Sequence, residues 1–99
     1  MTPEGKVKTK VKRLLVERGI YYFMPVSNGM GRHGIPDIIC CASGRYLAIE
    51  TKAGKGKTTA LQEREMERIR DAGGLALVVN DTDETFEDLI CLLNILQKR

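Results

Sequence analysis

The residues best suited to chemistry are two carboxylates and a lysine at a defined spacing. Pro36 and Asp37 come first, and Glu50, Thr51 and Lys52 follow thirteen residues after Asp37. Side chains of a strand alternate between its two faces, so Glu50 and Lys52 should point the same way and Thr51 the other. Two carboxylates and a lysine on adjacent strands are typical of a site that hydrolyses phosphodiester bonds with a divalent cation.

The proposed chemistry explains why these residue types are needed. Hydrolysis requires a nucleophilic water, neutralised phosphate charge and a stabilised leaving oxygen. Mg²⁺ prefers a few carboxylates together with waters and phosphate, so Asp37 and Glu50 suit it better than zinc. Lys52 would assist at the attacked phosphate, and the backbone carbonyl of Thr51 could complete the metal shell. Alternatively, Glu50 and Lys52 form a surface cross-strand ion pair worth less than ~1 kcal/mol.

The surrounding residues supply the elements that would hold this site. Apolar periodicity and the turn residues predict helices over 3–18, 59–72 and 83–97, and strands over 20–26, 35–41, 46–52 and 75–79. The first three strands can pair as antiparallel hairpins, while the crossover from Glu50 to Val79 should be right-handed and parallel. The sequence therefore predicts an α/β fold with a mixed central sheet flanked by helices, in the order αβββαβα.

Two polar side chains lie on helix faces that should point inward. Glu4 begins the stripe that continues with Val7 and Val11, and it either benefits from the helix N-terminus or serves the site. Gln62 shares a face with Met66 and looks toward the sheet. It either joins the site or bonds the helix cap, because the pattern from Thr59 to Gln62 also fits a capping box.

Length and composition limit the class of protein. The 99 residues, 42% hydrophobic and 29% charged, suit a single globular domain spanning 1–99. No stretch approaches the ~20 apolar residues that cross a bilayer, and the first residues lack the apolar core of a secretory signal. We expect no membrane association and a cytoplasmic location.

Basic residues suggest a polyanionic partner. The net charge is +3, and the first helix carries Lys6, Lys8, Lys10, Lys12 and Arg13, which are either phosphate contacts or a solvated face. In the glycine-punctuated loop before Asp37, we expect Arg32 and His33 to contact DNA phosphates. Gly29, Gly31 and Gly34 should allow this loop a close approach to the DNA backbone. Lys55 and Lys57 should bind DNA from the loop after Lys52. We do not assign His33 as a general base.

These motifs resemble the VRR-NUC domain, a branch of the PD-(D/E)XK nuclease superfamily. The most specific stretches are 34–39, 48–52, 61–62 and 72–74. The resemblance implies a restriction-endonuclease-like core in which Asp37, Glu50 and Lys52 match the catalytic residues and Gln62 matches the glutamine of the following helix. Glu4 is placed similarly to a glutamate often found on the first helix.

The resemblance also implies a function. It suggests a Mg²⁺- or Mn²⁺-dependent endodeoxyribonuclease that cuts Holliday junctions or other branched DNA, from a phage or a mobile element in a bacterial cell. A junction-cutting enzyme would be a two-fold homodimer. The apolar surface of the last helix could supply that interface or could face the sheet. The alternative function is a non-catalytic DNA-binding or interaction module that retains the nuclease fold.

Overall fold

The computed structural model describes residues 1–26 and 33–98 of the chain. The helices are α1 (Pro3–Glu17), α2 (Ala60–Asp71) and α3 (Asp83–Leu96), and the strands are β1 (Tyr21–Phe23), β2 (Ile38–Ala42), β3 (Arg45–Thr51) and β4 (Leu75–Val79). This order confirms the one predicted from the sequence. Within the described ranges, the helices are all too short or too polar to span a bilayer.

The strands form one four-stranded sheet in the order β1-β2-β3-β4. The first three are antiparallel neighbours, and β4 pairs in parallel with β3, as predicted. The hairpin between β2 and β3 turns at Ser43 and Gly44, which both have positive φ angles, 52° and 83°. Two such residues make the tight turn that matches the twist of a hairpin. This turn sets the register in which Ile38 lies opposite Ile49.

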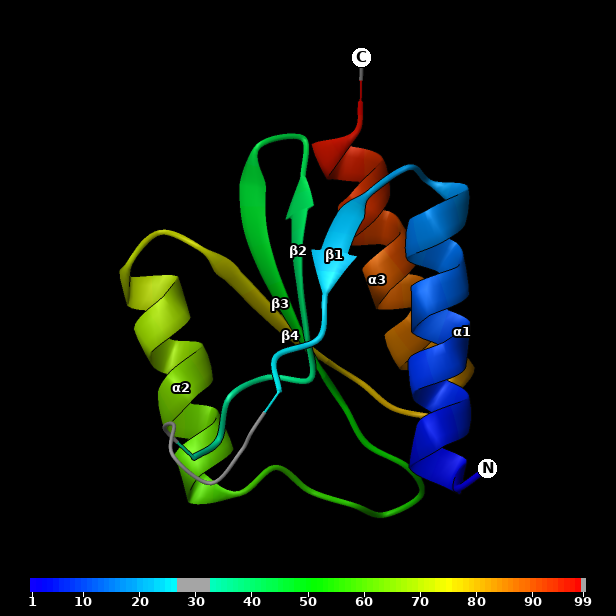
Figure 1. The fold of residues 1–99 in the computed structure, drawn as a ribbon, viewed down its shortest axis with the longest axis vertical. Helices are drawn as coiled ribbons and strands as arrows, with labels where there is room; N and C mark the ends of the chain where they lie inside the picture. Colours follow the sequence, from blue (N-terminus) through cyan, green and yellow to red (C-terminus); the bar gives the residue numbers. More distant parts are fainter. Residues whose placement is uncertain (27–32, 99) are drawn as a thin grey trace.

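Helices cover both faces of the sheet (Figure 1). Helices α1 and α3 lie together on one side, and α2 lies on the other. The main core fills the space between the sheet and helices α1 and α3, and its fully buried members include Val11, Leu15, Leu47, Ile49, Val79, Leu89 and Leu93. Side chains alternate between the two faces of β3, and both faces are buried near its end. Thr51 lies on the core side, and Glu50 lies on the side of α2.

Both ends of each of the first three strands are shifted by one to three residues from the predicted ones, while β4 matches the prediction. Strand β1 stops at Phe23, three residues before the predicted end, and Pro25 explains why, since proline cannot donate a ladder hydrogen bond. Strand β2 begins at Ile38 because Pro36 is equally unable to extend it. Strand β3 ends at Thr51. The consequence is that Asp37 and Lys52 stand just beyond the strand ends.

The last helix resolves one of the open alternatives. Leu89 and Leu93 of α3 are fully buried in the core, and Phe86, Leu92 and Leu96 pack against it. Cys91 and Ile95 are exposed, and Ile95 has 70% of its surface exposed. Most of the apolar surface of α3 therefore faces the sheet.

Candidate active site

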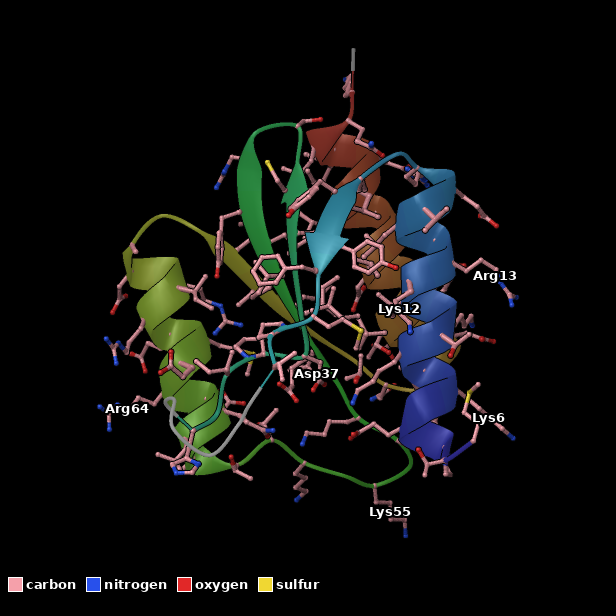
Figure 2. The ribbon with its side chains drawn as sticks, in the orientation of Figure 1. Lys6, Lys12, Arg13, Asp37, Lys55 and Arg64 are labelled. Atoms are coloured by element: carbon pink, nitrogen blue, oxygen red, sulfur yellow. The ribbon has the colours of Figure 1, made fainter. Side chains whose placement is uncertain are left out.

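The two carboxylates meet at one end of the sheet, as the sequence predicted. The pairing of β2 with β3 ends at Ile38 and Ile49, and one further step brings Asp37 opposite Glu50. Figure 2 places Asp37 between α1 and α2, below the strands. Each helix contributes a side chain to one of the carboxylates, Lys8 from α1 and Gln62 from α2.

Asp37 is fixed through one of its two oxygens. Its Oδ2 accepts a hydrogen bond of 2.9 Å from the Thr51 backbone N–H and another of 2.7 Å from the Thr51 Oγ1 hydroxyl. Its Oδ1 instead lies 3.7 Å from the Nζ ammonium of Lys8. The inward-facing Thr51 side chain, which the sequence analysis gave no role, therefore positions the carboxylate.

Glu50 is buried, with 2% of its surface exposed. Its Oε1 accepts a hydrogen bond of 3.1 Å from Gln62 Nε2. Its Oε2 is the one buried side-chain oxygen without a hydrogen-bond partner among the residues that the structure describes. The interpretation of Glu50 and Lys52 as a surface ion pair is therefore wrong, because a surface pair would leave both carboxylate oxygens in water.

Gln62 fills both of the roles that the sequence left open. Its Oε1 accepts from the Thr59 backbone N–H at 2.8 Å, and the Thr59 hydroxyl accepts from the Gln62 backbone N–H at 3.2 Å, which completes a capping box. Because the cap uses the amide oxygen, the amide nitrogen is left to donate to Glu50. The cap thus sets the orientation of the group that holds Glu50.

The pKa values of the two carboxyls are shifted in opposite directions. Burial alone would raise the pKa of Asp37, but the hydrogen bonds from Thr51, the adjoining Glu50 carboxyl and the charge of Lys8 outweigh burial and lower it below its ordinary value. Burial, followed by the adjoining Asp37 carboxylate, raises the pKa of Glu50 to about 8, while Lys52 acts in the opposite direction. Without a bound cation, Asp37 is therefore the more readily ionised carboxyl of the pair.

The donor set fits a hard divalent cation. Asp37 Oδ1 and Glu50 Oε2 are the carboxylate oxygens not engaged by Thr51 or Gln62, and a buried, unpartnered oxygen is the atom that a metal would satisfy. No cluster of three or more His, Cys, Asp or Glu side chains with metal-site geometry occurs within residues 1–26 and 33–98. Glu4 thus does not complete a three-carboxylate cluster, and its Oε2 lies 3.7 Å from Lys8 Nζ.

Lys52 lies beside the carboxylates. Its backbone N–H donates to the Val79 carbonyl at 3.0 Å and extends the parallel pairing one residue past β3. Its charge lowers the pKa of Glu50, against the larger effects of burial and Asp37. The predicted grouping of Asp37, Glu50 and Lys52 at one end of the sheet is therefore present.

Three of the four predicted DNA-binding residues, His33, Lys55 and Lys57, lie on exposed segments of the chain. Lys55 and Lys57 are exposed, and Lys55 projects from the loop between β3 and α2 (Figure 2). His33 is exposed beside α2, where it lines a hollow of about 150 Å³ with Leu61, Arg64, Glu65 and Arg68. Arg32 lies outside the described residues.

Gly34 makes its close approach to the protein itself. Its φ angle is +83°, and a Cβ at this position would lie 2.5 Å from the backbone carbonyl of Leu61 and 2.8 Å from the backbone nitrogen of Gln62. The glycine therefore lets the segment that leads to Asp37 pack directly on the first turn of α2. This contact accounts for a glycine at this position, while the approach of Gly34 to DNA stays a prediction. Gly29 and Gly31 lie outside the described residues.

Three side chains have site contacts that the sequence analysis missed. They are Lys8 and the hydroxyl of Thr51, described above, and Asp81, whose carboxylate accepts from the Gly54 backbone N–H at 3.2 Å and anchors the basic loop. Lys8 had a usable signal, because it follows Glu4 by four residues on the same helix. The role of Asp81 depends on a contact 27 residues away in sequence and had no local signal.

The fold and the site together define a PD-(D/E)XK-like nuclease domain of the VRR-NUC kind. Residues 5–79 match the family model of the archaeal Holliday junction resolvase, Hjc. The chain therefore belongs to this family, and this membership supports a resolvase-like nuclease function. A search among curated proteins gave no match.

Solved structures agree with this assignment. A VRR_NUC domain is 27% identical, with a TM-score of 0.77 over 91% of this chain and 96% of that one. A VRR_NUC domain protein is 21% identical, with a TM-score of 0.73 over 97% and 91% of the two chains. Hjc from Archaeoglobus fulgidus, a Holliday junction resolvase, is 22% identical, with a TM-score of 0.59 over 77% of this chain and 66% of that one. The last two likenesses concern the fold alone.

Proposed function

We propose that this chain is a Mg²⁺- or Mn²⁺-dependent endodeoxyribonuclease that selects branched DNA, in particular four-way junctions. The observation that carries the proposal is that the two oxygens of each carboxyl, in Asp37 and in Glu50, have different surroundings. One oxygen of each is held by the protein, while Glu50 Oε2 is buried without a partner. Burying Glu50 Oε2 without a partner lowers the stability of the folded protein unless a cation binds there.

Each residue of the proposed site has a distinct part. Asp37 and Glu50 hold the cation, and the Thr51 backbone carbonyl adds a ligand. The bound cation would supply charge neutralisation at the phosphate and a more acidic water. Lys52 orients the attacking water or stabilises charge on the phosphate, and Gln62 keeps Glu50 in place through the hydrogen bond of 3.1 Å.

The wider assignments rest on charge and on family membership. His33, Lys55 and Lys57 contact DNA phosphates around the site, and Arg32 is assigned the same role from the sequence. Residues 1–99 act as one nuclease domain, and two copies form a homodimer, because a symmetrical pair of cuts in a junction needs two active sites related by a two-fold axis. We infer a cytoplasmic location in a bacterial or phage-infected cell.

A cleavage assay tests this proposal. A labelled four-way junction and a linear duplex with the same arms are incubated with the protein and Mg²⁺ or Mn²⁺. We expect metal-dependent, symmetrical cuts confined to the junction. Glu50→Gln, which keeps the shape and the contact with Gln62 but removes the charge, should slow cleavage by about 100- to 1000-fold. Cleavage by Glu50→Gln at the wild-type rate would contradict the assignment.

The competing function is a non-catalytic DNA-binding module with the nuclease fold. The intact set of Asp37, Glu50 and Lys52 at one site favours the enzyme, because a binding module has no use for a buried carboxylate with a raised pKa. Junction binding without metal-dependent cleavage of either DNA would favour the module.

A further inference from the structure

Lys8 lies between two carboxylates on different parts of the fold. Its Nζ is 3.7 Å from Asp37 Oδ1 and 3.7 Å from Glu4 Oε2, which precedes it by one turn of α1. The Lys8 side chain is 28% exposed and that of Asp37 is 22% exposed. The ammonium is therefore partly shielded from water, at the Asp37 oxygen that Thr51 does not engage.

That oxygen is also the one available to a divalent cation. An ammonium and a dication near the same carboxylate oxygen repel each other, so the two compete for it. Lys8 can give way at low cost, because partly exposed ion pairs contribute about 1 kcal/mol or less and the lysine stem is flexible. Glu4 offers the ammonium a second carboxylate on the same helix, at the favourable spacing of four residues.

We propose that Lys8 is a built-in counter-cation of the site, which neutralises Asp37 in the metal-free protein and moves onto Glu4 when a divalent cation binds. This inference rests on the proposed function, in that Asp37 is taken to hold the cation. It also gives Glu4 a role different from the one predicted from the sequence. Glu4 retains the displaced lysine near the site and is not a ligand of the metal.

The test measures Mn²⁺ affinity, not cleavage. Mn²⁺ binding to the full chain is followed by isothermal titration or by electron paramagnetic resonance at low salt. Lys8→Met removes the competing charge, so Mn²⁺ should bind about three- to fivefold more tightly than to the wild type, and the gain should shrink at high salt. Lys8→Arg keeps the charge and should keep an affinity close to that of the wild type.

A matched control separates local competition from net charge. Lys12 follows Lys8 by one turn of α1, and Lys12→Met makes the same change in charge without touching Asp37. We expect its Mn²⁺ affinity to stay within about twofold of the wild type, because charges beyond the first contact are screened. Circular dichroism establishes that each variant is folded.

The outcomes distinguish this inference from the proposed function. Mn²⁺ that binds the wild type but not Asp37→Asn supports the metal site itself. If Mn²⁺ then binds Lys8→Met no more tightly than the wild type, or binds Lys12→Met equally tightly, the counter-cation role is overturned. If Mn²⁺ does not bind the wild type, the proposed metal site is wrong, and the counter-cation role falls with it.

Discussion

At the scale of single residues, the site depends on how the two carboxyls differ. Asp37 accepts two hydrogen bonds from Thr51 through one oxygen, and Glu50 is buried with one oxygen unpartnered. The first arrangement favours the charged carboxylate and the second disfavours it. A divalent cation that binds the pair should therefore displace a proton from Glu50.

The hydroxyl of Thr51 should matter for metal binding. Thr51→Val has nearly the same shape but loses the hydrogen bond of 2.7 Å to Asp37, leaving the one from the backbone N–H. Because groups that orient metal ligands typically contribute 10- to 100-fold, we expect Mn²⁺ affinity to fall by about tenfold. Titration of Mn²⁺ checks this, with Thr51→Ser as the control that keeps the hydroxyl. Equal affinity in Thr51→Val and the wild type would show that the backbone bond suffices.

The raised pKa of Glu50 predicts how stability depends on pH. In the folded protein this pKa is about 8, against an ordinary value of 4.5, so the folded state holds a proton that the unfolded chain has lost. The contribution of Glu50 to stability should therefore fall as the pH rises from about 4.5 to about 8. Asp37, whose pKa is lowered, acts on the acid side, where its contribution is lost as the pH falls below its ordinary value of 3.8.

Urea unfolding without divalent metal measures this effect. We expect the free energy of unfolding of the wild type to decrease between about pH 5 and about pH 8 more than that of Glu50→Gln, which cannot ionise. Identical pH dependence in the two proteins would show that Glu50 titrates normally.

At the scale of elements, the site is built by the ends of strands and by the start of α2. The sequence predicted the type and order of all seven elements, because apolar periodicity and turn residues are local signals. It placed β4 at 75–79, where the structure has it, but misplaced the ends of the first three strands. Those ends are set by Pro25 and Pro36 and by the side-chain bonds of Asp37, which replace ladder bonds beyond Ile38.

Gly34 connects the segment before Asp37 with α2. Gly34→Ala would place a methyl group 2.5 Å from the Leu61 backbone in addition to straining a positive φ angle, so we expect a loss of about 2–4 kcal/mol of stability. Gly44→Ala is the matched control, since it has the same φ angle of +83° but open space around it. It should lose only about 1 kcal/mol.

Thermal or urea unfolding of both variants checks the comparison. In Gly34→Ala the clash should also displace the segment that carries Asp37, so Mn²⁺ affinity should fall in this variant and not in Gly44→Ala. Equal stability of the two variants would mean that the contact with Leu61 relaxes freely.

The contacts within the site were only partly predictable. Asp37, Glu50, Lys52 and Gln62 could be found because carboxylates, a lysine and an inward glutamine stand out against the strand and helix patterns. The spacing of four residues could indicate the pair of Lys8 with Glu4. The contact of Lys8 with Asp37 could not be read from the sequence, because Asp37 lies 29 residues away and the contact depends on how α1 packs on the sheet. Asp81 was missed for the same reason.

At the scale of the whole molecule, the basic loop after β3 should govern DNA affinity. Each lysine that contacts a phosphate releases counterions on binding, and the logarithm of affinity then falls by about 0.9 per contact for each unit of log salt. Replacing both Lys55 and Lys57 with methionine should reduce the salt slope by about 2. The control is the double replacement of Lys12, on α1, and Lys98, at the C-terminal end of the chain. It makes the same change in net charge away from the loop.

Fluorescence anisotropy with a four-way junction over a range of salt concentrations measures these slopes, with Ca²⁺ in place of Mg²⁺ to limit cleavage. A slope that changes equally in the two double variants would assign the effect to net charge and not to the loop.

The central claim is that Asp37 and Glu50 together bind a divalent cation, and Mn²⁺ in crystals tests it most directly. The anomalous signal of manganese should give a peak in contact with Asp37 Oδ1 and Glu50 Oε2, and this peak should be lost in Glu50→Gln. A crystal that shows no manganese between these two carboxyls, under conditions in which the protein cleaves DNA, would contradict the account.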